Sequence, residues 1–124
     1  MNGLLDTSVV IDLIRHHKLA VDWIVQQPSL GVSAVVWMEI INGSRNKAEL
    51  LSEIKLLNRF TQIVPTEIDF SWGISQATQF RLSHNIDPLD CLIAASSQRL
   101  QLPLYTLNLK HFVPLIGALA QKPY

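Results

Sequence analysis

The fold is decided by a stretch near the start of the chain, GLLDTSVVIDL, which covers residues 3–13. A short apolar run ends on the carboxylate of Asp6, two hydroxyl residues follow, and a second apolar run begins. This pattern predicts a buried strand, a carboxylate at its C-terminal tip, and a helix that starts at once. Asp, Thr and Ser are all good helix N-caps, so a cap is the simpler interpretation of Asp6. In open α/β sheets, however, ligands bind at the C-terminal tips of the strands, so Asp6 is also a candidate functional group.

The composition predicts one domain over residues 1–124 with a substantial core, since 48% of the residues are hydrophobic. Ten basic and ten acidic residues cancel, so the net charge favours neither a nucleic-acid nor a membrane partner. The single cysteine cannot form an internal disulfide, and the N-terminal residues lack a signal-peptide pattern. No apolar run approaches the roughly 20 residues that a membrane span needs. We therefore expect a cytoplasmic protein with no membrane partner.

Short strand and helix patterns alternate along the chain. Strands are predicted near residues 3–5, 29–32, 61–64 and 102–105, with a short edge strand near Leu119. Helices are predicted over residues 8–14, 19–26, 34–41, 47–59 and 69–83, and from Asp87 onward; the helix over 69–83 offers Phe70, Ile74, Ala77 and Phe80 as core contacts. Helical segments between strands require parallel pairing. The predicted fold class is therefore α/β: a three-layer α/β/α domain with a central, mainly parallel sheet of about four or five strands.

Two further acidic residues stand in apolar surroundings. Glu39 is the only charge in residues 34–41, which are apolar almost all round, and a buried carboxylate needs a partner. It could face solvent, pair with a base such as Arg45, or hold a cation. Asp90 falls in the first turn of the helix that Asp87 and Pro88 open, where its simplest role is a favourable interaction with the helix dipole. Asp87 is well placed as the N-cap of that helix, with proline at the first helical position.

Four polar side chains are expected to converge at one edge of the sheet. Asp6 and Asn108 follow strands, whereas Glu39 and Asp90 lie in helices that should flank the strand tips. Three carboxylates and an amide, without clustered His or Cys, form an oxygen-rich set that favours Mg²⁺ or Mn²⁺ over zinc. A divalent cation would compensate the repulsion among the carboxylates, activate water and stabilise charge on a phosphoryl oxygen.

Four motifs in this order resemble the PIN-domain family. They are LDTS at residues 5–8, the helix that bears Glu39, DCLIAA at residues 90–95, and TLN at residues 106–108 followed by Phe112. The order and spacing match over nearly the whole chain. Its size and layout look most like the VapC-type toxins of bacterial toxin–antitoxin pairs.

The resemblance implies a metal-dependent ribonuclease with a parallel sheet between helices. It implies that Asp6, Glu39 and Asp90 are metal ligands, that Asn108 occupies a fourth catalytic position, and that Thr106 is a hydroxyl residue near the metal. The cofactor implied is Mg²⁺, for which Mn²⁺ can substitute. For VapC-type toxins the resemblance also implies a homodimer, an RNA substrate, and a cognate antitoxin whose C-terminal segment occupies the cleft. It further implies cleavage by metal-activated water that leaves a 5′-phosphate and a 3′-hydroxyl.

The sequence also departs from the family pattern. Asn108 is neutral where the family often has Asp, and zero net charge is less basic than RNA binding suggests. The candidates for phosphate contact are Arg15, His16, Lys18, Arg45, Lys47, Lys110 and His111, each of which could equally be solvated surface. Trp37 and Trp72 are candidates for stacking on RNA bases or for the core.

The sequence therefore favours a Mg²⁺-dependent endoribonuclease that acts as the toxin of a type II toxin–antitoxin pair. One alternative is phosphoryl transfer through an aspartyl-phosphate at Asp6, although Ser8 stands where such phosphatases usually carry a second Asp. The other alternative is a catalytically inactive PIN-like module that binds RNA or protein.

Overall fold

A five-stranded sheet, with all strands parallel, forms the centre of the molecule. The computed structural model describes all residues, 1–124. The strands are β1 (Leu4–Leu5), β2 (Gly31–Ser33), β3 (Thr61–Ile63), β4 (Leu104–Tyr105) and β5 (Ala120–Gln121). They lie in the order β3-β2-β1-β4-β5. The predicted α/β class and parallel sheet are confirmed, including the edge strand close to Leu119.

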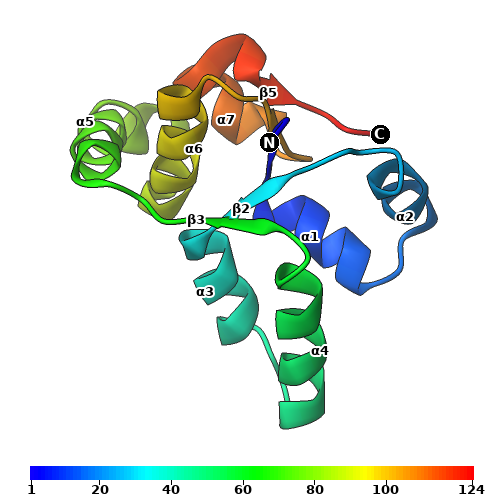
Figure 1. Ribbon diagram of the computed structural model, residues 1–124. Helices are drawn as coiled ribbons and strands as arrows, with labels where there is room; N and C mark the ends of the chain where they lie inside the picture. The colour runs from blue at the N-terminus through cyan, green and yellow to red at the C-terminus, as the bar shows by residue number, and fades with distance from the viewer.

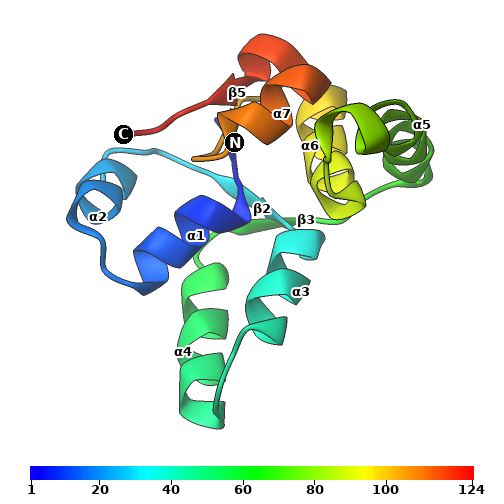
Figure 2. The same cartoon turned by 180° about the vertical axis from the view of Figure 1, so that it is seen from behind.

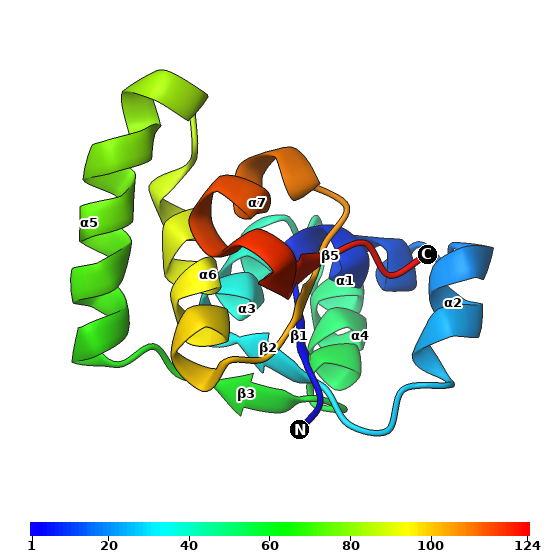
Figure 3. The ribbon, with the colours of Figure 1, turned by 90° about the horizontal axis from the view of Figure 1, so that it is seen from above.

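Helices cover both sides of this sheet. They are α1 (Thr7–Ile14), α2 (Lys18–Ile24), α3 (Ala34–Asn42), α4 (Lys47–Leu57), α5 (Glu67–His84), α6 (Pro88–Leu100) and α7 (Leu109–Ile116). As drawn in Figures 1 and 2, α3 and α4 extend below β2 and β3, whereas α7 lies above them. Figure 3 shows α5 and α6 side by side at one end of the molecule and α2 at the other. None of the helices combines the length and the apolar character needed to cross a membrane.

The first strand lies in the middle of the sheet and explains why the opening stretch dominates the fold. Leu4 and Leu5 are almost completely buried, as expected of a central parallel strand that is covered on both faces. From β1 the chain builds β2 and β3 on one side, and it later returns to place β4 and β5 on the other. The strand order therefore reverses between β1 and β4, where open α/β sheets form their ligand crevice.

Two features of the fold differ from the sequence prediction. The helix α7 was not predicted; it follows directly after Asn108 and contains Pro114, a residue that usually argues against a helix interior. Phe70 and Ile74 were predicted as core contacts and this was wrong, because they are 51% and 67% exposed. At Gly73 the helix α5 approaches α6 so closely that a Cβ atom would stand 3.6 Å from the Leu92 backbone. The contact face is therefore centred on Gly73, and Phe70 and Ile74 lie outside it, whereas the predicted core contacts Ala77 and Phe80 are confirmed.

An ion pair between a buried carboxylate and a partly exposed arginine joins α5 to α6. Asp69 is 1% exposed and accepts hydrogen bonds from Nε and Nη2 of Arg99, at 2.9 and 3.1 Å. It also completes a capping box with Thr66 at the start of α5. Burial alone would raise the pKa of Asp69, but the hydrogen bonds from Arg99 and Thr66 and the Arg99 charge outweigh it, so the pKa lies below its ordinary value of 3.8.

Replacing Asp69 by Asn is expected to destabilise the protein by about 2 kcal/mol at pH 7, because a charge-assisted pair and part of the cap are lost. Since the folded-state pKa is lowered, the carboxylate stabilises the fold above pH 3.8, and this contribution is lost as the pH falls through the folded-state pKa. The difference between wild type and variant should therefore shrink at about pH 3. Urea unfolding at both pH values measures this difference in the free energy of unfolding. Glu67→Gln, which removes an exposed charge from the same helical turn, is the control; equal losses in both variants would contradict the prediction.

Candidate active site

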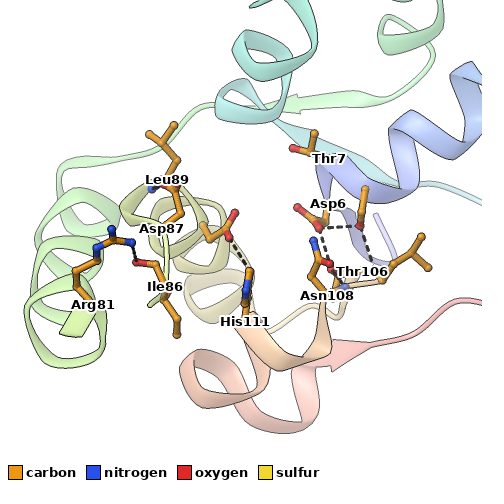
Figure 4. A network of polar contacts seen from close by, with 12 residues as sticks. Asp6, Thr7, Arg81, Ile86, Asp87, Leu89, Thr106, Asn108 and His111 are labelled. Carbon is orange, nitrogen blue, oxygen red and sulfur yellow. Dashed lines mark hydrogen bonds and ion pairs between the residues drawn. The ribbon is translucent and has the colours of Figure 1, made fainter. Parts of the chain in front are cut away.

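Asp6 is the residue that follows β1, and its side chain does not cap the helix. It occupies the N-cap position of α1 but makes no side-chain capping hydrogen bond. Instead, its Oδ2 accepts hydrogen bonds from Ser8 Oγ at 2.9 Å and from Thr106 Oγ1 at 2.8 Å (Figure 4). The side chain is nevertheless almost fully buried, with the residue 2% exposed. The capping interpretation of this side chain is therefore wrong, and Asp6 is held at the strand tip by hydroxyl groups.

The same hydroxyl groups tie the turn after β1 to the turn after β4. Thr106, which is completely buried, accepts a hydrogen bond from the backbone N–H of Asn108 at 2.9 Å. Ser8 Oγ accepts one from the backbone N–H of Leu107 at 3.1 Å. The position of the Asp6 carboxylate is thus fixed from both sides of the point where the strand order reverses.

Glu39 lies on α3 and receives a hydrogen bond from Thr7 Oγ1 at 2.8 Å. Its suggested pairing with Arg45 is wrong, because Arg45 pairs with Glu49 at 3.2 Å. Burial raises the pKa of Glu39 above its ordinary value; the hydrogen bond from Thr7 opposes this shift, and the charges of Asp6 and Asp87 add to it. Glu39 therefore lies within electrostatic reach of two further carboxylates.

Asp90 lies in the first turn of α6, with its side chain 18% exposed. Burial raises its pKa to about 7, and the charges of Asp6, Glu39 and Asp87 contribute to the shift. Its Oδ2 lies 3.5 Å from Nδ1 of His111, which reaches across from α7 (Figure 4). Asp87 caps α6 as predicted, since its Oδ1 accepts a hydrogen bond from the backbone N–H of Leu89 at 2.8 Å.

Asn108 occupies the N-cap position of α7 without a side-chain capping bond. Its side chain is exposed, and Figure 4 shows it beside Asp6 and Thr106. The amide of Asn108 is therefore available to a ligand, whereas the carboxylate of Asp6 is nearly buried beneath it. The predicted site residues Asp6, Asn108 and Thr106 meet at the tips of β1 and β4. Glu39 on α3 and Asp90 on α6 lie near enough for the charge of Asp6 to raise the pKa of both.

Asp6, Glu39, Asp87 and Asp90 form an acid cluster, and no Lys or Arg of the chain compensates its negative charge. No Lys or Arg forms an ion pair with Asp6, Glu39, Asp87 or Asp90, and the only basic side chain near one of them is His111, beside Asp90. No three His, Cys, Asp or Glu side chains are close enough together to form a ready-made metal cage. Mg²⁺ keeps several waters and needs only one or two carboxylates, so the donor set fits Mg²⁺ rather than a closed zinc site.

A groove of about 710 Å³ opens beside the cluster, between α1, α3 and α4. Thr7 and Glu39 line its end nearest the acids, and two of the predicted phosphate contacts, Arg15 and Arg45, also line it. Glu49 and the buried Glu53 add further carboxylates. By contrast, Lys18 is engaged with Asp22 at 2.6 Å, away from this groove.

A sequence model of the PIN domain matches residues 3–112 of this chain. The chain belongs to the PIN-domain family. This PIN domain is 35% identical over 113 residues to Ribonuclease VapC10 of Mycobacterium tuberculosis (strain ATCC 25618 / H37Rv), a match that covers 88% of this chain and 84% of that protein.

Solved structures share the fold of this PIN domain. A toxin-antitoxin complex from Klebsiella pneumoniae matches with a TM-score of 0.81 and 24% identity, covering 99% of this chain and 98% of that one. VapBC-1 from nontypeable Haemophilus influenzae matches with a TM-score of 0.75 and 25% identity, covering 90% of each chain. These matches establish the fold independently of the sequence family.

Sequence reasoning assigned no role to the two hydroxyl residues that follow Asp6 in this PIN domain. Thr7 binds Glu39 and Ser8 binds Asp6, so each serves a different acid of the cluster. The sequence did offer a signal for them, since both follow the first acid of the motif within two positions. The aromatic candidates Trp37 and Trp72 are partly buried and pack against the core.

Proposed function

We propose that this PIN domain is a Mg²⁺-dependent endoribonuclease and the toxin of a type II toxin–antitoxin pair. The observation that carries the proposal is the position of Asp6. Its nearly buried carboxylate makes no capping hydrogen bond to α1. It is held instead by Ser8 and Thr106 at the point where the strand order reverses. The similarity to Ribonuclease VapC10 supports RNA as the substrate.

The chain's own residues have distinct roles in this proposal. Asp6 and Asp90 would hold the cation from opposite sides of the cleft, and Asn108 would contribute its neutral amide. Glu39, oriented by Thr7, would hold the cation or position the attacking water. The bound Mg²⁺ would supply Lewis-acid chemistry, lowering the pKa of water and neutralising charge on the scissile phosphate. Since no side chain here is an obvious nucleophile, cleavage by water suits the site better than an aspartyl-phosphate.

The groove beside the acids is the proposed binding site of an antitoxin segment. Glu39 and Glu53, which line this groove and form no ion pair with a Lys or Arg of the chain, suit a segment with basic side chains. The solved relatives described as VapBC and toxin-antitoxin complexes support a partner of this kind. Such a segment would cover Thr7 and Glu39 and thereby block access of RNA to the cleft.

A second copy of the chain is the proposed partner of an apolar face formed by α5 and α6. A hollow of about 300 Å³ lies between these helices and is bordered by Phe70, Ile74 and Leu89. These three side chains are 51%, 67% and 47% exposed, although each is large and apolar. A homodimer formed in the cytoplasm would cover them.

Metal removal tests the proposed chemistry. Partner-free protein, purified under denaturing conditions and refolded, should cleave structured RNA with Mg²⁺ or Mn²⁺. It should lose all cleavage in EDTA and regain it when the metal is restored. Cleavage that persists in EDTA would overturn the mechanism. Metal binding without cleavage of any RNA offered would instead favour a catalytically inactive binding module.

A further inference from the structure

The start of α7 contributes two side chains to the acid cluster. Asn108 is the N-cap of this helix, and His111 follows three positions later in its first turn. Their backbones are joined by a hydrogen bond from His111 N–H to the Asn108 carbonyl at 3.0 Å. The backbone N–H of Asn108 donates to Thr106, which in turn donates to Asp6. His111 faces Asp90 on α6. The start of α7 therefore links Asp6 with Asp90, the two residues that are proposed to hold the cation.

The backbone of His111 is held in place by the packing of α7 against the core. The next residue, Phe112, is completely buried, and Leu115 and Ile116 anchor the same helix in the core. The imidazole is 41% exposed, so it stands at the edge of the cleft and not in the core. Because α7 is anchored, the ring can restrain Asp90 against rotation about its side-chain bonds.

We propose that His111 is a positioning residue: its Nδ1, which lies 3.5 Å from Asp90 Oδ2, fixes the orientation of this carboxylate and thereby sets the divalent-cation affinity of the cleft. The inference rests on the proposed function, in which Asp6 and Asp90 hold the cation. Carboxylates that bind metals are themselves held by hydrogen-bonding groups, and loss of such a group typically weakens metal binding by about 10- to 100-fold. His111 needs no contact with RNA for this role.

Three variants of the full chain test this role, with Mn²⁺ alone as the probe. His111→Ala removes the ring. His111→Asn keeps an amide N–H close to the place of Nδ1, since both nitrogens are attached to Cγ. His84→Ala removes an exposed histidine at the end of α5 and serves as the control. Electron paramagnetic resonance measures the Kd for Mn²⁺, and circular dichroism establishes that each variant is folded.

We expect His111→Ala to raise the Kd for Mn²⁺ about tenfold, and His111→Asn and His84→Ala to stay within about twofold of wild type. In the RNA cleavage assay, His111→Ala should need more Mn²⁺ but reach nearly the wild-type rate at saturation, because Asp90 itself is retained. An unchanged Kd in His111→Ala, or a Kd in His111→Asn as high as in His111→Ala, would overturn the inference. So would the absence of Mn²⁺ binding by the wild type.

The experiment also separates this inference from the proposed nuclease. If Mn²⁺ binding depends on His111 but the wild type cleaves no RNA, the positioning role stands and the nuclease proposal fails. If the wild type cleaves RNA but His111→Ala binds Mn²⁺ as tightly as wild type, the nuclease proposal stands and the positioning role fails.

Discussion

Asp90→Asn is expected to abolish RNA cleavage and, in the absence of metal, to make the protein more stable. The variant keeps the shape of the side chain but loses the charge that would help to hold the cation. Loss of a principal ligand should lower the cleavage rate by at least about a thousandfold, corresponding to roughly 4 kcal/mol of transition-state stabilisation. The gain in stability follows first from the cost of burying the Asp90 charge, to which repulsion from Asp6, Glu39 and Asp87 adds.

The pH dependence of that stability gain has a definite sign. The pKa of Asp90 rises from an ordinary value of 3.8 to about 7 in the folded protein. Folding therefore favours the protonated carboxyl: its contribution is fully present below pH 3.8 and is lost as the pH rises through 7. In EDTA, Asp90→Asn should match the wild type near pH 4 and be more stable by on the order of 2–4 kcal/mol at pH 8.

Thermal or urea unfolding in EDTA at both pH values, together with cleavage assays on the same samples, measures this prediction. Asp22→Asn, which removes an exposed carboxylate from α2, is the control and should change neither quantity. Saturating Mg²⁺ should stabilise the wild type and narrow its difference from Asp90→Asn at pH 8, since a ligand that binds only the folded state stabilises it. A variant that cleaves RNA at the wild-type rate would exclude Asp90 from the site.

Thr106→Val is expected to have the second largest effect, although the two side chains have nearly the same shape. Thr106 is completely buried, donates to Asp6 Oδ2 at 2.8 Å and accepts from the Asn108 N–H at 2.9 Å. Valine would leave that backbone N–H without a partner and Asp6 with one hydroxyl donor instead of two. The expected cost is about 2 kcal/mol in the free energy of unfolding. The expected loss in cleavage rate is about 10- to 100-fold, because Asp6 would lose its fixed orientation.

Thr106→Ser is the matched control, since it keeps the hydroxyl and removes only a methyl group. It should recover most of the cleavage rate, while its stability should fall by about 1 kcal/mol for the buried methyl group. Initial rates at saturating Mg²⁺ and urea unfolding separate the two effects. If valine and serine reduced cleavage equally, the hydroxyl would have no part in orienting Asp6.

The sequence was sufficient to place the acids but not to decide what each side chain does. The pattern around Asp6 correctly put a carboxylate at a strand tip, because apolar periodicity and the strand-to-helix turn are local properties. Whether Asp6 caps the helix depends on Thr106, which lies 100 positions away and meets it only in the folded sheet. The partner of Glu39 was missed for a similar reason: nearby Arg45 was considered, but the hydrogen bond comes from Thr7, 32 positions earlier.

Helix faces were the other source of error, and again tertiary contact decided the outcome. Phe70 and Ile74 have the spacing of core residues, yet α5 meets α6 at Gly73, where the absence of a side chain permits the closest approach. The helix α7 was missed although it carries His111 and follows Asn108 directly; the proline within it weakens its local signal. Asp87 was predicted correctly as a cap, because capping depends only on residues a few positions away.

The hydroxyl bonds between the β1 and β4 turns have a consequence for synthesis of the chain on the ribosome. Thr106 and Asp6 are 100 positions apart, and Leu107 and Ser8 are 99 positions apart. Asp6 is among the first residues to emerge, but it cannot be held in its final place until β4 has been made and has docked beside β1. The proposed cation site should therefore stay incomplete on a growing polypeptide until translation is almost finished.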